Sequence, residues 1–238
     1  MNTIVRKIDR RRTYIMMTDT ETCNAFMGED GRLDLSCSLV YDIGWQVIDK
    51  RGNVYLQRSY IVDDIFNYEK DLMASAYYAH KLPQYYADIE SGKRIVKSFY
   101  EIRRQFFNDM RLFRTNIVAC HNARFDHNAL NVSQRWLTKS KYRYFFPYGT
   151  EIWDTLKMAN DVICKMPSYI AFCQENGYLT KHKTPRPKAT AEILYRYISG
   201  NNDFIENHTG LEDVDIERQI LAYCFKQHKK MRKGLYEK

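Results

Sequence analysis

The stretch YIMMTDTETCN, residues 14–24, sets two carboxylates at the end of an apolar run. The run 14–17 has the composition of a buried strand, and we expect a strand over residues 13–19. Asp19 and Glu21 then share one face, because residues two apart in a strand point to the same side. Two carboxylates so close repel each other unless a cation lies between them, and hard divalent ions such as Mg²⁺ prefer oxygen ligands. The pair taken alone is more simply explained as two solvated acids in a loop.

The periodicity around this stretch indicates an α/β fold with a mixed sheet, because strands are followed by alternating helices and strands. Further strands are expected at 36–49, 54–62, 117–120 and just before Asp154. The turn KRGN joins the first two of these as a hairpin. Helices are expected at 95–110, 126–138, 155–164, 168–176, 188–199 and 211–230. The basic segment KHKTPRPK, residues 181–188, contains two prolines and is expected to be a loop.

Length and charge place limits on the class of protein. The 238 residues fit a single domain over 1–238, with a basic N-terminal extension over 1–12 and a basic tail over 226–238. The formal charge of +8 favours a polyanionic partner, most often nucleic acid, although a generally basic protein has the same charge. Six scattered cysteines without zinc spacing indicate reduced thiols and a cytoplasmic protein. No apolar run is long enough for a membrane helix or a signal peptide, so we expect no membrane partner.

A second carboxylate lies on the inward face of a predicted helix. In HNARFDHNAL, residues 121–130, Asp126 comes three and four residues before Ala129 and Leu130 of the apolar stripe. A carboxylate at this position is either the N-cap of the helix or an active-site group at the edge of the core. The pattern alone does not favour one over the other.

A third inward carboxylate opens the last helix. In HTGLEDVDIERQILAYC, residues 208–224, Asp213 comes seven residues before Ile220 and shares its face. A buried carboxylate needs a partner, and a salt bridge or the helix dipole would also supply one. His208 precedes Asp213 by five residues. Taken alone, this histidine is most simply a surface residue.

The order of these motifs closely resembles the DEDDh superfamily of 3′→5′ exonucleases, which includes RNase T and the proofreading epsilon subunit of bacterial DNA polymerase III. The segments that carry the resemblance are DTET (19–22), HNARFD (121–126), WDTLKMA (153–159), KATAEILYRY (188–197) and HTGLED (208–213). It extends from residue 13 to about residue 225. The resemblance implies an RNase H-like fold with a five-stranded mixed sheet flanked by helices. It also implies hydrolysis of phosphodiester bonds with two Mg²⁺ or Mn²⁺ ions, which releases nucleoside 5′-monophosphates.

The resemblance assigns a catalytic role to each motif residue. By motif position, Asp19 would bridge both ions, while Glu21 and Asp213 would hold the ion that binds the attacking water. Asp126 would hold the second ion, and His208 would be the general base. Two ions about 3.5–4 Å apart suit an in-line phosphoryl displacement, and a histidine has a pKa suited to taking the proton.

The loop after Glu21 departs from the family pattern, which often continues DTETTG where this chain has DTETCN. In the family, the backbone here approaches the terminal base and sugar, so the resemblance predicts substrate contacts in this loop and in the second motif. The candidates are Thr22, Cys23, Asn24, His121 and Asn122. His121 is equally compatible with a structural role. Asp154 is expected to be a helix N-cap, and Asp42 has no predicted role.

The tyrosines of residues 63–94 fit core packing better than stacking on bases. For the whole chain, the leading prediction is a 3′→5′ exonuclease that acts on DNA, at single-stranded or frayed 3′ ends. An exoribonuclease of the same fold is the alternative, because nothing in the sequence shows which group meets the ribose 2′-OH. A catalytically silent nucleic-acid-binding module is disfavoured, since all five motif positions are filled. A polymerase partner is compatible with the sequence, but no tethering segment is evident.

Overall fold

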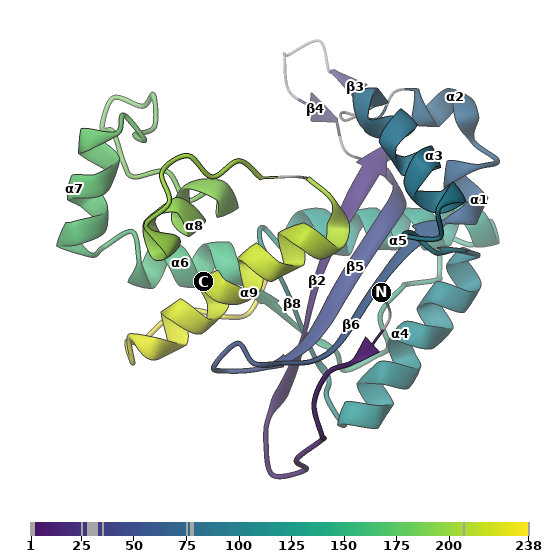
Figure 1. The fold of residues 1–238 in the computed structure, drawn as a ribbon, viewed down its shortest axis with the longest axis horizontal. Helices are drawn as coiled ribbons and strands as arrows, with labels where there is room; N and C mark the ends of the chain where they lie inside the picture. The colour runs from purple at the N-terminus through teal and green to yellow at the C-terminus, as the bar shows by residue number, and fades with distance from the viewer. Residues whose placement is uncertain are drawn as a thin grey trace.

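A mixed β-sheet forms the centre of the computed structural model (Figure 1). The structure describes residues 3–24, 26–27, 33–34, 36–74, 76, 79–206 and 208–237. The sheet contains β1 (Thr3–Ile4), β2 (Tyr14–Cys23), β5 (Leu39–Asp49), β6 (Val54–Val62), β7 (Val96–Lys97), β8 (Ile117–Cys120) and β9 (Glu151–Asp154). Its order is β1-β6-β5-β2-β8-β9, with β7 paired to β6. β3 (Phe26–Met27) and β4 (Leu33–Asp34) form a separate pair.

The α/β class and the hairpin β5–β6 are confirmed, and the five expected strands are all present. The expected number of five is nevertheless too small, because the sheet has seven strands in the described part of the chain. The two additional strands, β1 and β7, are two residues long. A two-residue strand has no periodicity that a sequence pattern can reveal.

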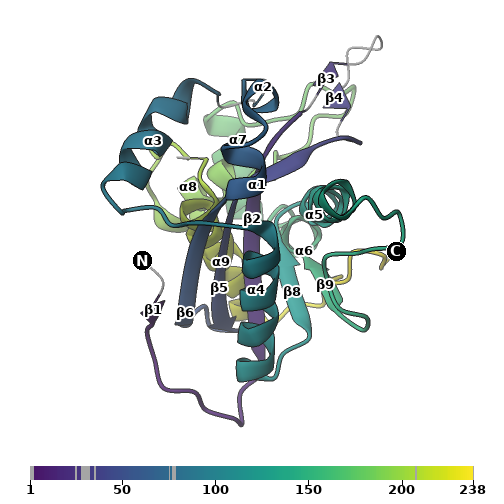
Figure 2. The ribbon, with the colours of Figure 1, turned by 90° about the vertical axis from the view of Figure 1, so that its right-hand side faces the viewer.

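Helices flank the sheet on both faces (Figure 2). They are α1 (Asp63–Phe66), α2 (Lys70–Met73), α3 (Leu82–Glu90), α4 (Phe99–Phe113), α5 (Arg124–Thr138), α6 (Thr155–Val162), α7 (Pro167–Glu175), α8 (Ala191–Ser199) and α9 (Gly210–Lys226), with a short 3₁₀ helix η1 (Ala79–Lys81). The helix expected over 95–110 begins at Phe99, because Ser98 and Glu101 form a capping box there. The helix expected from residue 188 begins only at Ala191.

The central strand β2 is buried on both faces. Tyr14 and Met16 belong to one apolar core, to which α1, α3, α4 and α5 also contribute. Ile15 and Met17 belong to the other core, which α6, α7, α8 and α9 cover. This alternation is why the strand reads as a continuous apolar run in the sequence. The same strand therefore fixes both layers of helices around the residues that follow it.

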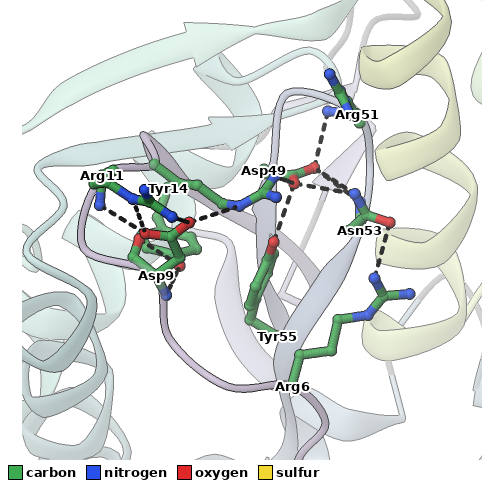
Figure 3. Close-up of polar contacts among 9 residues, drawn as sticks. Arg6, Asp9, Arg11, Tyr14, Asp49, Arg51, Asn53 and Tyr55 are labelled. Carbon is green, nitrogen blue, oxygen red and sulfur yellow. Dashed lines mark hydrogen bonds and ion pairs between the residues drawn. The ribbon is translucent and has the colours of Figure 1, made fainter.

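The basic N-terminal segment is tied to the hairpin turn between β5 and β6, at the end of the sheet where β2 begins (Figure 3). Arg12 donates to the Asp49 carboxylate at 2.8 Å, and Arg6 donates to the Asn53 side chain at 3.1 Å. The Tyr55 hydroxyl also donates to Asp49, at 3.2 Å. These two arginines therefore have structural partners in the sheet.

The segment after α9 packs along the other edge of the sheet. The backbone of Leu235 donates to Ile152 of β9 at 2.8 Å, and the Lys157 ammonium donates to the Leu235 carbonyl at 2.6 Å. This contact places the C-terminal segment beside β9 and α6 (Figure 2). Among the described residues, no helix has the length and apolar character needed to cross a membrane.

Candidate metal and nucleic-acid site

The first two carboxylates lie where β2 extends beyond its neighbour β8. The two strands are parallel partners only at Met16 and Met17, and β8 ends at Cys120. The strand expected to end at residue 19 continues to Cys23, because β5 pairs with it along its whole length. Asp19 and Glu21 therefore lie within the strand, on the edge that β8 leaves uncovered.

Asp126 comes to this edge from the first turn of α5, directly after β8. The N-cap position of α5 is Ala123. Of the two interpretations of Asp126, the helix N-cap is therefore wrong. Its side chain is buried, and Oδ1 accepts a hydrogen bond of 2.8 Å from the Thr20 hydroxyl. Because Thr20 lies between Asp19 and Glu21 in β2, this bond holds the second motif against the first.

The third motif completes a compact group of ligand atoms. Glu21, His208 and Asp213 each offer one such atom, and these atoms lie within 4.8 Å of one another. Asp213 is in the first turn of α9, while His208 precedes the helix with a left-handed φ of 47°. The Nδ1 atom of His208 also lies 3.9 Å from the carboxylate of Glu206. The structure thus brings together residues from the first and third motifs.

Glu217 is a further carboxylate of the site that sequence reasoning missed. It follows Asp213 by one turn of α9 and is 3% exposed. It lines a cleft together with Asp19, Glu21 and Asp213. Its Oε2 atom has no hydrogen-bond partner among the described residues, and burial raises the pKa of this carboxyl well above its usual value. The sequence did contain a signal, because Glu217 comes three residues before Ile220 of the inward stripe, as Asp126 does before Ala129.

Burial raises the pKa of every carboxylate in the group. It raises the pKa of Glu21 to about 8, that of Asp126 to about 7 and that of Asp213 to about 9. For Asp19, burial raises the pKa well above its usual value, and the nearby charge of Glu217 raises it further. So much negative charge in one place is stable only with protons or a cation.

The donor set fits a hard divalent cation. It consists of carboxylate oxygens and one imidazole, which are ligands that Mg²⁺ and Mn²⁺ accept. Two buried oxygens of the group, Oδ1 of Asp213 and Oε2 of Glu217, have no hydrogen-bond partner in the part of the chain that is described. Burial, and then the charge of Lys81, lower the pKa of His208, which favours its neutral form.

The residues expected to contact substrate are only partly brought together. Thr22, His121 and Asn122 line a cleft of about 1230 Å³ together with Asp19, Glu21 and Asp213. The ring nitrogens of His121 lie 2.9 Å from the Thr155 hydroxyl and 2.8 Å from the Ala189 carbonyl, a structural arrangement.

Cys23 and Asn24 are not among the residues that line the cleft. Cys23 is completely buried, and Asn24 is 5% exposed. Asn24 has a left-handed φ of 61° at the position where the related motif has glycine, a conformation that asparagine tolerates. The loss of that glycine therefore leaves the left-handed turn in place.

The basic segment between α7 and α8 forms one wall of the cleft. It is closed as a loop by a bridge between Leu179 and Pro187 and by a 2.9 Å bond from the Thr180 amide to the Arg186 carbonyl. The side chains that it adds to the lining include His182, Lys183, Arg186 and Lys188. A cationic wall thus faces the acidic one across the cleft.

Two other acidic residues have structural hydrogen bonds. Asp154 caps α6 by accepting a 3.0 Å bond from the Leu156 amide, as expected. Asp42, which had no predicted role, is fully buried beside Glu21 on the neighbouring strand. It accepts hydrogen bonds from the Tyr85 hydroxyl at 2.7 Å and from Arg94 at 3.2 Å.

The contact with Asp42 confirms the packing interpretation for Tyr85, which is 1% exposed. The packing interpretation does not hold for every tyrosine of the segment 63–94, because Tyr68 and Tyr86 are 77% and 46% exposed. Tyr77 and Tyr78 lie outside the described residues.

Comparison with solved structures identifies the fold. No protein-family model matches the sequence, and no curated protein matches it significantly. The structure is similar to a 3′-exonuclease solved for 3′-end recognition of a histone mRNA stem-loop, with a TM-score of 0.54, 12% identity and coverage of 93% of this chain and 85% of that one. It is also similar to the nuclease domain of 3′hExo, a DEDDh family member bound to rAMP, with a TM-score of 0.52, 12% identity and coverage of 94% and 96%.

These likenesses define an α/β protein with the RNase H-like fold of the DEDDh 3′-exonucleases, as the sequence motifs predicted. The specific resemblance to the epsilon subunit stays a prediction.

Proposed function

We propose that the chain is a single exonuclease domain that hydrolyses nucleic acid from the 3′ end with the help of two divalent ions, Mg²⁺ or Mn²⁺. The observation that carries the proposal is the group formed by Glu21, His208 and Asp213, whose ligand atoms lie within 4.8 Å of one another, beside the half-buried Asp19 and the buried Asp126. Single-stranded or frayed 3′ ends are the expected substrate, as predicted from the sequence.

We assign the carboxylates around Asp19 to two ions. Glu21 and Asp213 belong to the compact group with His208, and they would hold one ion. Asp126 and Glu217 raise the pKa of Asp19 from outside that group, and they would hold the other ion. Bound divalent ions would supply Lewis acidity to the phosphoryl oxygens and lower the pKa of the attacking water.

His208 would take the proton of the attacking water. Its pKa is lowered by burial and by the Lys81 charge, so the imidazole is neutral and able to accept a proton near pH 7. His208 precedes α9 and has a left-handed backbone conformation. Its ring lies next to the carboxylate of Glu206. The positive side chains of Lys183 and Arg186 would bind phosphates of the strand across the cleft.

DNA is the leading prediction for the substrate, and RNA is the specific alternative. The alternative is supported by the similar 3′-exonuclease solved for recognition of a histone mRNA stem-loop and by the rAMP bound to 3′hExo. A polymerase partner and a cytoplasmic location stay predictions from sequence alone.

The test uses two oligonucleotides of the same sequence, one DNA and one RNA, each labelled at the 5′ end and carrying a single-stranded 3′ end. We expect a ladder of one-nucleotide steps with Mg²⁺ or Mn²⁺ that disappears with EDTA and with Asp19→Ala. Asp203→Ala, which changes an exposed acid away from the cleft, serves as the matched control and should leave the ladder intact. Cleavage of RNA alone would select the exoribonuclease, and no cleavage of either strand would reject the proposal.

A further inference from the structure

A second surface of the protein exposes aromatic side chains. The segment between α5 and β9 contains Tyr142, Tyr144 and Tyr148, which are 78%, 58% and 108% exposed. Trp136, near the end of α5, is 39% exposed. Single exposed aromatic residues are common on proteins, but a contiguous group of them marks an interaction surface.

Positive side chains lie directly over these rings. The Lys139 ammonium is 4.8 Å from the centroid of the Trp136 ring, and the Lys141 ammonium is 5.1 Å from that of Tyr142. The Arg135 guanidinium lies 5.9 Å from the centroid of Tyr144. Three of the four exposed rings therefore each have a cation beside them.

Two small hollows meet at Tyr148. One, of about 380 Å³, is lined by Arg111 and Arg114 of α4 as well as by Tyr148. The other, of about 280 Å³, is lined by Tyr148, Tyr144 and His127. We call the surface formed by Trp136, Lys139, Lys141, Tyr142, Tyr144 and Tyr148, with these two hollows, the aromatic groove.

Helix α5 connects the candidate site to the aromatic groove, because it carries Asp126 in its first turn and Trp136 near its end. His127, which lines one of its hollows, directly follows the buried Asp126 in α5. The His127 ring stacks on Phe146 of the exposed segment, with centroids 6.1 Å apart and an interplanar angle of 6°. A chain leaving the site along α5 would therefore meet the groove.

The charge of the groove fits a polyanion. Residues 135–150 contain four Lys or Arg residues (Arg135, Lys139, Lys141 and Arg143) and no Asp or Glu. Asp109 of the neighbouring α4 is buried and bonded to Arg58, while Glu151 is an exposed acid at the edge. Basic side chains without acidic partners favour nucleic acid over a typical protein surface.

We propose that the aromatic groove binds the single-stranded part of the nucleic acid whose 3′ end occupies the site, an inference that rests on the proposed function. Exposed rings stack on unpaired bases of either DNA or RNA, whereas a duplex keeps its bases stacked inside. The interleaved lysines would contact the phosphates between those bases. The groove would therefore hold long single strands more tightly than short ones.

The first experiment measures binding without cleavage. Fluorescence anisotropy in EDTA follows 20-nucleotide single strands of DNA and RNA, with wild-type protein and with Tyr142→Ala or Tyr148→Ala. We expect each tyrosine variant to bind about fivefold or more weakly, with an unchanged salt dependence, because stacking releases no counterions. Lys139→Gln/Lys141→Gln should instead reduce the slope of log affinity against log salt by about 1.4, since each phosphate contact in a single strand contributes about 0.7.

Matched controls separate the groove from general effects. Tyr68→Ala removes an equally exposed tyrosine near α1, and Lys229→Gln/Lys230→Gln removes two exposed charges beyond α9. We expect both to bind like the wild type. Equal losses in these controls and in the groove variants, or no loss in the groove variants, would overturn the proposal.

A second experiment distinguishes the groove from the catalytic proposal. We expect a dinucleotide to occupy the site without reaching Tyr148, so Tyr148→Ala should cleave it with unchanged kcat/KM and cleave the 20-nucleotide strand less efficiently. Equal kcat/KM changes for both substrates would overturn the groove. A different outcome is that the wild-type protein cuts neither DNA nor RNA, while Tyr148→Ala still weakens binding. That outcome would reject the catalytic function and support the groove.

Discussion

Gly44 of β5 and Gly210 at the start of α9 lie backbone against backbone. A Cβ atom on Gly210 would come within 2.7 Å of the Gly44 amide nitrogen, and one on Gly44 would overlap the Gly210 carbonyl carbon. Asp42 strengthens the contact by accepting a hydrogen bond of 3.4 Å from the Gly210 amide. This close approach is what sets Asp213 beside the carboxylate of Glu21.

Gly44→Ala is expected to destabilise the protein and to abolish metal-dependent activity. The neighbouring atoms belong to the backbone, so α9 has to move away from β5, at a cost of about 3 kcal/mol or more. Urea unfolding and Mn²⁺ binding check the two effects. Gly234→Ala is the control, because its Cβ would meet only an ordinary contact of 3.5 Å with Glu237. Wild-type stability in Gly44→Ala would show that α9 does not depend on this contact.

The metal-free protein is expected to become less stable as pH rises from about 5 to 9. The pKa of Glu21 is raised from 4.5 to about 8 by burial, so between these values the folded protein keeps a proton that the unfolded chain has lost. Raising the pH therefore favours unfolding, by about 1.4 kcal/mol per pH unit for each such group. Asp126 and Asp213, raised to about 7 and about 9, act in the same direction.

Urea unfolding in EDTA at several pH values measures this dependence. With saturating Mn²⁺ the slope should flatten or reverse, because metal binding requires the deprotonated carboxylates and releases their protons. A stability that rises with pH in EDTA would mean that the carboxylates are already paired with cations of the protein.

Much of the fold could be predicted from the sequence because its central elements have strong periodicity. β6 and β8 have the expected bounds, and the apolar stripe expected for α5 is buried at Ala129 and Leu130, whereas Trp136, expected on the same stripe, is 39% exposed. The end of β2 could not be predicted, since pairing with β5, rather than local composition, carries the strand through two carboxylates. The contacts of the basic N-terminal segment, such as Arg12 with Asp49, also depend on the tertiary fold.

The candidate site was predictable where a residue belongs to a motif. The structure gathers Asp19, Glu21 and Asp213 as expected, because each motif lies at the end or start of a regular element. Glu206 lies in the loop before α9, where no period applies, and its contact with His208 was not foreseen. Cys23 was misplaced because the continued strand turns its side chain into the core.

Glu217→Gln is expected to weaken Mn²⁺ binding and to stabilise the metal-free protein. The change keeps the shape of the side chain and removes a charge from a buried group whose members repel one another. Calorimetric titration should show at least a tenfold loss of affinity for one of two ions, in the range of about 10–100-fold seen when a metal site loses a supporting group. The melting temperature in EDTA should rise by a few degrees.

Glu212→Gln provides the matched control for Glu217. It removes one charge from the same helix, but its carboxylate accepts a 2.8 Å hydrogen bond from the Thr209 hydroxyl, which a glutamine oxygen still accepts. It should bind Mn²⁺ like the wild type. Unchanged Mn²⁺ stoichiometry and affinity in Glu217→Gln would assign Glu217 a structural role in α9.

Lys183→Gln/Arg186→Gln is expected to raise KM for oligonucleotides and leave kcat nearly unchanged. Both side chains line the cleft wall opposite the carboxylates, where they can hold phosphates before and during the reaction equally well. Steady-state kinetics at 50 mM and 200 mM salt should show a KM about tenfold higher at the lower salt and a smaller difference at the higher salt. Lys181→Gln, in the same loop but outside the cleft lining, is the control. A fall in kcat with unchanged KM would instead place the loop in the chemical step.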